Sequence, residues 1–449
     1  MLKKLSLFFL ILLSYGHQYS MAQVLLQTSK VYEQKPAKKG YILFAPLFSK
    51  TTYLIDYNGR VAKTWTSRYN PGQSVYLLPD GNLLRTGNDS SRYFSGGGGV
   101  IELFDQKGIL KWHYQISDSM QRQHHDVCPL PNGHLLVLCW ERISKEDALL
   151  KGRKQSAQFL WSEKIIELIP EGSHSAKIVW QWRLWDHLMQ DVSANELAGT
   201  EVKGHPEKLD INFLATESPD WLHFNSVDYQ AEKDQILISN RNLSEIYIID
   251  HSTTTAEAAS GQGGRWHRGG DFLFRWGNPL AYQSGSEKEQ QLFRQHDATW
   301  IPKGLKGQGS ILVFNNGVQR NRAEAEYSEV LSLLPVTDSS GNYLTSNGRY
   351  LPEYPDWIYQ AKERSSFFSF NVSSAQRLPN GHTLICEGAE GRFFEVNEMG
   401  ETVWVYTNPY GVKLAADRPE IQNQVFRCSW HGENENAIRN LKIRKKQLK

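Results

Sequence analysis

The chain has 449 residues, 40% hydrophobic and 12% aromatic, enough for a large core in one multi-bladed domain or in two or three separate ones. Fifty Lys and Arg residues face 48 Asp and Glu residues, so the near-neutral charge gives no reason to expect a nucleic-acid partner. The four cysteines are too few for a disulfide scaffold and form no CxxC pair, which argues against a structural zinc site.

Residues 1–22 are typical of a secretory signal peptide. Two lysines precede the apolar run Leu5–Leu13, and the small residues of Ser20–Ala22 offer a cleavage site. This run is too short to span a bilayer, and no other segment is long and apolar enough, so no membrane span is expected. Cleavage would leave a mature chain with zero net charge, periplasmic or secreted, that starts with an N-terminal segment at residues 23–39.

From residue 40 to residue 430, short β-branched and aromatic runs alternate with Asn-Gly, Asp-Gly and Pro-x-Gly turns, which predicts an all-β domain. A repeat of four strands appears when these runs are aligned on the turn between the first and second strands. The first strands begin at Gln73, His125, His223, His296 and Ser373. Third strands are expected at Val100–Phe104, Lys164–Ile169, Glu245–Asp250, Glu329–Leu334 and Arg392–Val396. Fourth strands carry Trp112, Trp180, Trp276 and Trp404. Such a repeat is typical of propeller blades.

The two ends of this domain complete each other. The runs Tyr41–Phe44, Tyr53–Tyr57 and Val61–Trp65 are three strands without a first strand, and Val425–Trp430 is one strand without partners. Pairing them would make a sixth blade and remove two exposed sheet edges. The sequence therefore predicts a six-bladed β-propeller closed by its N- and C-terminal strands, followed by a basic, solvated tail at residues 431–449.

Histidine fills the same place in three copies of the repeat, at His125, His223 and His296. The first strand of each blade lines the channel of a propeller, so the alignment brings these side chains to one height around the axis. A shift of one residue would present His124 instead of His125. Arg241 follows the second strand of the His223 copy and could reach the same mouth, or form a surface ion pair instead.

Three imidazoles and a guanidinium fit two chemistries. Three histidines are a familiar ligand set for zinc or copper. An arginine beside a dication is unfavourable, whereas the same arginine favours an oxyanion such as sulfate, phosphate or carboxylate. Arg241 therefore favours an anion site over a metal centre.

From about residue 40 to residue 430, the chain resembles the bacterial arylsulfate sulfotransferases. The phrases that carry the resemblance are Asp220–Val227, Ser239–Arg241, Gln295–Ile301 and Phe314–Gly317. It implies a periplasmic six-bladed propeller that moves a sulfuryl group from an aryl sulfate to a phenolic acceptor, without a nucleotide donor or any other cofactor. Better-known members carry an N-terminal β-domain, whereas residues 23–39 alone precede the propeller here, so monomer and homodimer both stay open.

The resemblance also implies roles for the polar residues. His296 matches the family's nucleophile, His223 with Arg241 its histidine–arginine pair, and His125 its remaining active-site histidine. The implied mechanism is ping-pong, because neutral His296 attacks the sulfur, forms a sulfohistidine and releases a phenol before a second phenol takes the sulfuryl group.

The same mechanism needs stabilised charge on the non-bridging oxygens and a proton donor for the leaving phenol. Arg241, His223 and Asn225 would stabilise the oxygens. His125 would exchange the proton, and His124 is a second candidate for contact with the substrate.

Two other functions stay open. A secreted propeller that binds an anionic ligand through these residues would show saturable binding without turnover. A metal-dependent hydrolase or lyase with His125, His223 and His296 as ligands would contain metal and lose activity with a chelator.

Overall fold

A computed structural model describes residues 29–31, 39–94, 96–191, 201–320, 325–413 and 421–443. The predicted signal peptide at residues 1–22 and most of the segment at residues 23–39 lie outside these ranges. Within them, no helix is long and apolar enough to cross a membrane.

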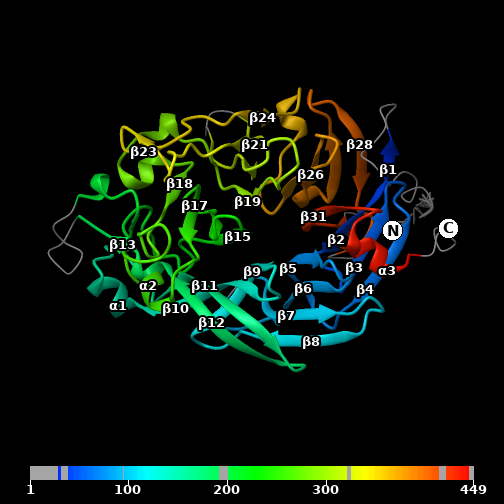
Figure 1. Cartoon of the computed structure of the whole chain (residues 1–449), viewed down its shortest axis with the longest axis horizontal. Coiled ribbons are helices and arrows are strands. Elements are labelled where there is room, and N and C mark those ends of the chain that lie inside the picture. Colours follow the sequence, from blue (N-terminus) through cyan, green and yellow to red (C-terminus); the bar gives the residue numbers. More distant parts are fainter. Residues whose placement is uncertain are drawn as a thin grey trace, which may run out of the picture.

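The described chain is mostly β, with a propeller-like arrangement of sheets (Figure 1). One strand group has the order β31 (Val425–Gly432), β2 (Gly40–Pro46), β3 (Thr51–Asp56) and β4 (Val61–Thr66). The next comprises β5 (Asn70–Leu77), β6 (Leu83–Asn88), β7 (Gly99–Phe104) and β8 (Leu110–Gln115). It is joined through β5 to β9 (Gln121–Pro129), β10 (Leu135–Ser144), β11 (Phe159–Glu171) and β12 (Ser175–Arg183).

The second half of the chain repeats this order. One group comprises β15 (Phe224–Gln230), β16 (Gln235–Asn240), β17 (Glu245–Asp250) and β18 (Phe274–Trp276). The next comprises β19 (His296–Trp300), β20 (Ile311–Asn315), β21 (Glu329–Leu333) and β24 (Trp357–Tyr359). The last comprises β25 (Ser374–Arg377), β26 (Thr383–Glu387), β27 (Arg392–Val396), β28 (Thr402–Thr407) and the added strand β1 (Ser29–Val31).

Short elements decorate these groups. Two-stranded pairs are β13 (Leu188–Met189) with β14 (Leu209–Asp210), β22 (Thr345–Ser346) with β23 (Arg349–Tyr350), and β29 (Val412–Lys413) with β30 (Ile421–Gln422). The α-helices are α1 (Lys145–Leu150), α2 (Thr255–Ala258) and α3 (Asn436–Leu441). Single 3₁₀ turns lie at Leu184–Asp186, Val202–Gly204, Pro279–Tyr282, Glu287–Glu289, Arg364–Ser366 and Gly388–Glu390.

The first strands of the groups form a closed series of contacts. β31 contacts β5, β5 contacts β9, β9 contacts β15, β15 contacts β19, β19 contacts β25, and β25 contacts β31. Figure 1 shows the labelled members of this series, β5, β9, β15, β19 and β31, near the middle of the molecule with the later strands further out. The first strands therefore surround one central axis, as the repeat predicted.

The outer strands are linked by tryptophan. Each indole N–H donates to an oxygen of the following group: Trp65 to Asp105, Trp112 to Ser175, Trp180 to Thr253, Trp276 to Pro352 and Trp404 to Tyr57. The last of these bonds returns from the end of the chain to its beginning. The repeated tryptophan is therefore a hydrogen-bonded link between neighbouring sheets.

Apolar clusters fill the space between neighbouring groups. Leu135 and Val137 of β10 pack with Leu84 of β6, whereas Leu136 and Leu138 of the same strand pack with the next group, which includes Phe224. Successive side chains of a strand point to opposite faces, so a strand covered on both faces is apolar at every position. This burial explains the near-continuous apolar runs of the second and third strands.

The chain ends close the ring. β2 pairs antiparallel with β31 from Gly40–Gly432 to Pro46–Val425, and β1 pairs antiparallel with β28. The predicted closure by N- and C-terminal strands is confirmed, and β1 adds a second link that the sequence did not predict.

Part of the predicted basic tail is packed rather than solvated. Helix α3 buries Ala437 and Ile438, each 5% exposed, in a cluster with Leu43 and Leu77. The lysines and arginines around this short apolar pair suggested a solvated end, whereas the pair itself binds the helix to the core. Residues 444–449 of the tail lie outside the described ranges.

Candidate active site

The first strands are bulged at the level of the predicted site. The ladder shifts register between Pro71 and Val75, between Phe224 and Ser226, and between His296 and Thr299. Left-handed backbone occurs here at Gln73, His125, His223, Asp297 and Ser373, with φ between 49° and 128°. Bulges and such backbone are frequent beside active sites, because they take side chains out of the ladder and turn them in a new direction.

Hydrogen bonds between neighbouring first strands define which residues are equivalent. Backbone N–H groups donate from Val227 to Asp126 (3.2 Å), from Ala298 to Ser226 (3.0 Å) and from Ala375 to Asp297 (3.2 Å). The residues that precede these acceptors, His125, Asn225 and His296, therefore share one position. The predicted alignment of His223 with the other two histidines is wrong by two residues, because this copy lacks the Pro-x-Gly turn that set the alignment elsewhere.

His223 nevertheless reaches the same place. Its ring centroid lies 4.6 Å from that of His125, with the two rings tilted by 71°. Nδ1 of His223 donates to the Asp220 carboxylate at 2.5 Å, which leaves Nε2 for a ligand. Although burial acts in the opposite direction, the interactions of Asp220 with His223 and Arg241 hold its pKa below the ordinary value.

Asn316 orients the His296 ring. Its Nδ1 lies 2.7 Å from Oδ1 of Asn316, and the Asn316 amide nitrogen donates to the carbonyl oxygens of Ser369 (2.7 Å) and Val372 (3.1 Å). Because those carbonyls accept only, the Asn316 nitrogen faces them and its Oδ1 faces the histidine. Nδ1 of neutral His296 therefore carries the proton, and Nε2 keeps its lone pair.

Both first-strand histidines are neutral at neutral pH. Burial, the positive charge of Arg241 and nearby His223 lower the pKa of His296 well below its ordinary value. Burial and His223 have the same effect on the pKa of His125. The exposed fractions of His125 and His296 are 6% and 2%, whereas the His223 side chain is 23% exposed.

Arg241 lies beside this cluster. Its backbone N–H donates to the carbonyl of His223 at 3.2 Å, and its Nη1 donates to Oδ1 of Asn242 at 3.0 Å. Burial and the positive charge of Arg294 lower the pKa of Arg241 to about 10, so the guanidinium stays charged at neutral pH. Neither Arg241 nor Arg294 forms an ion pair with a carboxylate in the part of the chain that the structure describes.

Of the two predicted substrate contacts, His124 has both ring nitrogens engaged, whereas Asn225 keeps an unpartnered Oδ1. The His124 ring is fully buried, stacks on Trp140 at 4.1 Å, and bonds through Nδ1 to His125 and through Nε2 to Glu163, both at 2.9 Å. No ring nitrogen of His124 is left for a substrate. The Asn225 amide nitrogen donates to the Gln295 carbonyl at 2.7 Å and keeps a second N–H.

The structure thus brings His125, His223, Arg241 and His296 together, and it adds three residues that the sequence reasoning missed. These are Asp220, Asn316 and Glu163, which bond to His223, His296 and His124. Asp220 and Asn316 lie inside the phrases that carried the family resemblance and could have been selected from them. Glu163 belongs to β11, far along the chain from its partner, and no local signal marks it.

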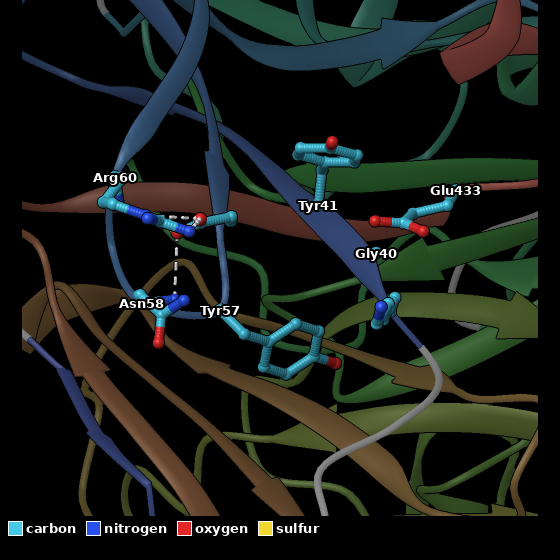
Figure 2. Close-up of a pocket in the computed structure, with 8 residues that line it drawn as sticks. Gly40, Tyr41, Tyr57, Asn58, Arg60 and Glu433 are labelled. Carbon is cyan, nitrogen blue, oxygen red and sulfur yellow. Dashed lines mark hydrogen bonds and ion pairs between the residues drawn. The ribbon is translucent and has the colours of Figure 1, made fainter. Parts of the chain in front are cut away.

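Within the described ranges, no group of three His, Cys, Asp or Glu side chains has the arrangement of a metal site. A 340 Å³ pocket on the N-terminal sheet, with Tyr41 and Glu433 on one side and Arg60 on the other (Figure 2), includes none of the predicted site residues. A 550 Å³ cavity includes Asn242 and Arg294, which bond to each other beside Arg241. Of these two cavities, the second therefore lies beside Arg241.

Among solved structures, the chain is similar to a protein of unknown function from Bacteroides caccae, with a TM-score of 0.48 and 11% identity over 87% of this chain and 98% of that one. It is also similar to the β-propeller domain of Cps50 (Swd1) from Myceliophteria thermophila, with a TM-score of 0.40 and 10% identity over 85% and 90% of the two chains. A third is the periplasmic gluconolactonase PpgL of Pseudomonas aeruginosa, with a TM-score of 0.41 and 12% identity over 87% and 99%. Similarities this low carry no argument about function.

The sequence itself is more specific. No curated protein matches it. The family model described as Arylsulfotransferase (ASST) matches residues 27–438, a range that includes every histidine, arginine and asparagine discussed above. The chain therefore belongs to the arylsulfotransferase (ASST) family and is an aryl-sulfate sulfotransferase.

Proposed function

We propose that the enzyme moves a sulfuryl group from an aryl sulfate to a phenolic acceptor by a ping-pong mechanism, with a sulfohistidine at His296. One observation carries the proposal. The Asn316 amide, held by two backbone carbonyls, accepts the Nδ1 proton of His296 and leaves a lone pair on Nε2 of a buried, neutral imidazole. A neutral nitrogen with an available lone pair is what a covalent nucleophile requires.

In the first half-reaction, Nε2 of His296 attacks the sulfur. The nitrogen–sulfur bond forms as the bond between sulfur and the aryl oxygen breaks, and the phenol leaves. In the second half-reaction, the oxygen of another phenol attacks the same sulfur, the sulfur–nitrogen bond breaks, and His296 returns to its neutral form. No separate acid is needed to release His296 from the sulfur, because cleavage of the sulfur–nitrogen bond returns the electron pair to Nε2.

Arg241 and His223 act on the sulfuryl oxygens. Charge on these oxygens is stabilised best by fixed donors in a site from which water is excluded. The charged guanidinium of Arg241, paired with no carboxylate in the described chain, supplies such donors. His223 supplies another in the form that carries protons on both ring nitrogens, because its Nδ1–H is already bonded to Asp220. The remaining N–H of Asn225 is a third donor at the same level as the two first-strand histidines.

Proton exchange with the phenols runs through His125, His124 and Glu163. Burial raises the pKa of Glu163 and lowers that of His124, so the resting relay is uncharged. In this state Glu163 donates to His124, His124 donates to His125, and Nε2 of His125 carries a proton for the leaving phenolate.

When His125 gives that proton away, each member of the relay passes one proton along. Glu163 ends as a carboxylate, His124 carries its proton on Nε2, and Nε2 of His125 is free to accept the proton of the second phenol. The same residues therefore act as acid in the first half-reaction and as base in the second. His124 is therefore proposed to relay a proton rather than to contact the substrate directly.

The strand groups support the finer prediction of six blades, with β31 and β2–β4 as the blade that joins the two ends of the chain. The signal peptide predicted at residues 1–22 is the reason to propose a periplasmic or secreted enzyme, since such segments direct export. Subcellular fractionation with an antibody against the mature chain checks the location.

The experiment that tests the function measures 4-nitrophenol release from its sulfate ester, with and without added phenol. We expect release that phenol stimulates, and intact-mass analysis after donor alone should show one added sulfuryl group. His296→Ala should abolish both signals, whereas His431→Ala, a change at a histidine outside the site, should abolish neither. Turnover that survives His296→Ala, or a sulfuryl group on another residue, would overturn the assignment of the nucleophile.

A further inference from the structure

The 550 Å³ cavity beside the histidine cluster has a composition that selects a substrate class. Its lining includes the aromatic rings of Phe213 and Phe293, the amide of Asn242, and the guanidinium of Arg294. A cavity of this size is sufficient for an aromatic ring with a short substituent. Half-buried phenylalanines offer faces on which such a ring can stack.

This cavity borders the cationic part of the candidate site. Oδ1 of Asn242 accepts from Arg241 at 3.0 Å and from Arg294 at 3.3 Å, so one oxygen holds two guanidinium groups. Arg241 in turn acts electrostatically on His296. A ring bound in this cavity would therefore lie on the side of the candidate site that carries Arg241.

Arg294 is a cation without a compensating carboxylate. Its other side-chain bond goes to the neutral Oε1 of Gln319 at 3.3 Å, and no ion pair involves it in the described residues. Arg320, which also lines the cavity, is paired with Glu329 at 2.5 Å and covers Phe293. The carboxylate among the lining residues, Glu287, is exposed on a short 3₁₀ turn. The cavity therefore keeps one partly buried, unneutralised positive charge.

We propose that this cavity binds the ring of phenolic acceptors that carry an anionic substituent such as a carboxylate, and that Arg294 determines this specificity by pairing with the substituent. The inference rests on the proposed sulfuryl transfer to phenols. A guanidinium binds a carboxylate through two parallel charge-assisted hydrogen bonds, and these are stronger where water is partly excluded. Neutral phenols would occupy the same cavity without that pair.

The test compares 3-(4-hydroxyphenyl)propionate with its methyl ester, which has the same ring and hydroxyl but no charge. With 4-nitrophenyl sulfate as donor, kcat/KM for the acid should exceed that for the ester by about 10- to 100-fold, as expected for one charge-assisted pair. Arg294→Gln should remove this preference, so that kcat/KM for the acid and for the ester, both measured in the variant, agree within about threefold. Arg294→Lys should restore part of the preference, and Arg439→Gln, at an exposed arginine of helix α3, should leave it unchanged.

Calorimetric titration of both compounds into the resting enzyme separates this proposal from the proposed function. Tighter binding of the acid that depends on Arg294, in an enzyme that sulfates no phenol, would refute the transfer reaction and retain the anion-selective cavity. Equal binding and equal turnover of acid and ester by the unmodified enzyme would overturn the cavity proposal. So would a preference for the acid that persists in Arg294→Gln.

Discussion

Asn316→Leu removes the oxygen that accepts the Nδ1 proton of His296 at 2.7 Å. Without that oxygen, the reactive tautomer leaves a buried N–H unpaired, at a cost of about 1–3 kcal/mol relative to the tautomer with its proton on Nε2. Since the second tautomer has no lone pair toward the sulfur, kcat/KM should fall roughly 5- to 150-fold.

Part of the activity loss in Asn316→Leu would come from a less stable fold. Asn316 is fully buried, and its amide nitrogen also satisfies the carbonyls of Ser369 and Val372. Its loss would lower the stability of the fold as well as the activity, so circular dichroism and thermal melting must accompany the kinetics. Asn316→Asp loses the same N–H donors but keeps an acceptor for His296, so comparison of the two variants isolates the effect of the acceptor.

In Asn316→Asp, the new negative charge favours the imidazolium form of His296. An opposite charge within hydrogen-bond distance raises the pKa of a histidine by about 1–3 units. Neutral His296 is the active form, so activity is lost as pH falls through its pKa. In the unmodified enzyme this acid limb should lie well below pH 6.5, because the pKa of His296 is lowered, and in the variant it should move upward.

The assay is the pH profile of kcat/KM for 4-nitrophenyl sulfate between pH 4 and pH 9, at saturating phenol. An unchanged acid limb in folded Asn316→Asp would refute the reasoning, because the carboxylate would then not act on the nucleophile. Full activity of a folded Asn316→Leu would refute it independently, since the tautomer would not depend on Asn316.

Three further predictions concern other parts of the molecule. Glu163→Gln keeps a hydrogen bond to His124 but cannot supply a proton to the relay. The rate loss should therefore be about 10- to 100-fold larger for phenyl sulfate, whose leaving group needs the proton, than for 4-nitrophenyl sulfate. The measurement is the slope of log rate against the pKa of the leaving phenol. Arg427→Met leaves two buried carboxylates unpaired and should lower the free energy of unfolding by about 3–5 kcal/mol in urea titrations, whereas an unchanged midpoint would contradict this. The pKa of His251 is raised, because hydrogen bonds to Glu167 and Asp234 outweigh the effect of burial. Protonated His251 therefore stabilises the folded protein below pH 6.5, and this stabilisation is lost as the pH rises through the pKa of the folded state. His251→Gln should therefore lower the melting temperature more at pH 6 than at pH 9, and equal losses would count against the reasoning.

Much of the fold was predictable because it repeats. β17 and β27 have the predicted bounds, Glu245–Asp250 and Arg392–Val396, since each is an apolar run between turn residues. The closing strands were predictable because the N-terminal end of the domain had three strands without a first strand, and the C-terminal end had one strand without partners. The full length of β10, Leu135–Ser144, was harder to predict, because its ladder with β9 is interrupted between Val137 and Cys139 and then resumes.

The site was predictable only in part. His125 and His296 stand at a fixed distance from a Pro-x-Gly turn, so their shared position was visible in the sequence. His223 has no such turn, and the bulge in β15 gives its register position to Asn225 instead. The orientation of each imidazole depends on Asn316, Asp220 and Glu163, and contacts made through the tertiary fold leave no periodic signal in a single sequence.

The bulged strands explain why closing the ring also supports the site. Asp126 and Asp297 directly follow His125 and His296, and both carboxylates pair with Arg427 of β31, at 2.8 Å and 2.7 Å. The strand that joins the C-terminus to the first sheet therefore binds the two segments that carry the candidate acid and the candidate nucleophile. Because Asp126 and Asp297 also accept backbone bonds from the next strands, a displacement of β31 would move both histidines together. The contacts that close the ring are thus also the contacts that position the two histidines.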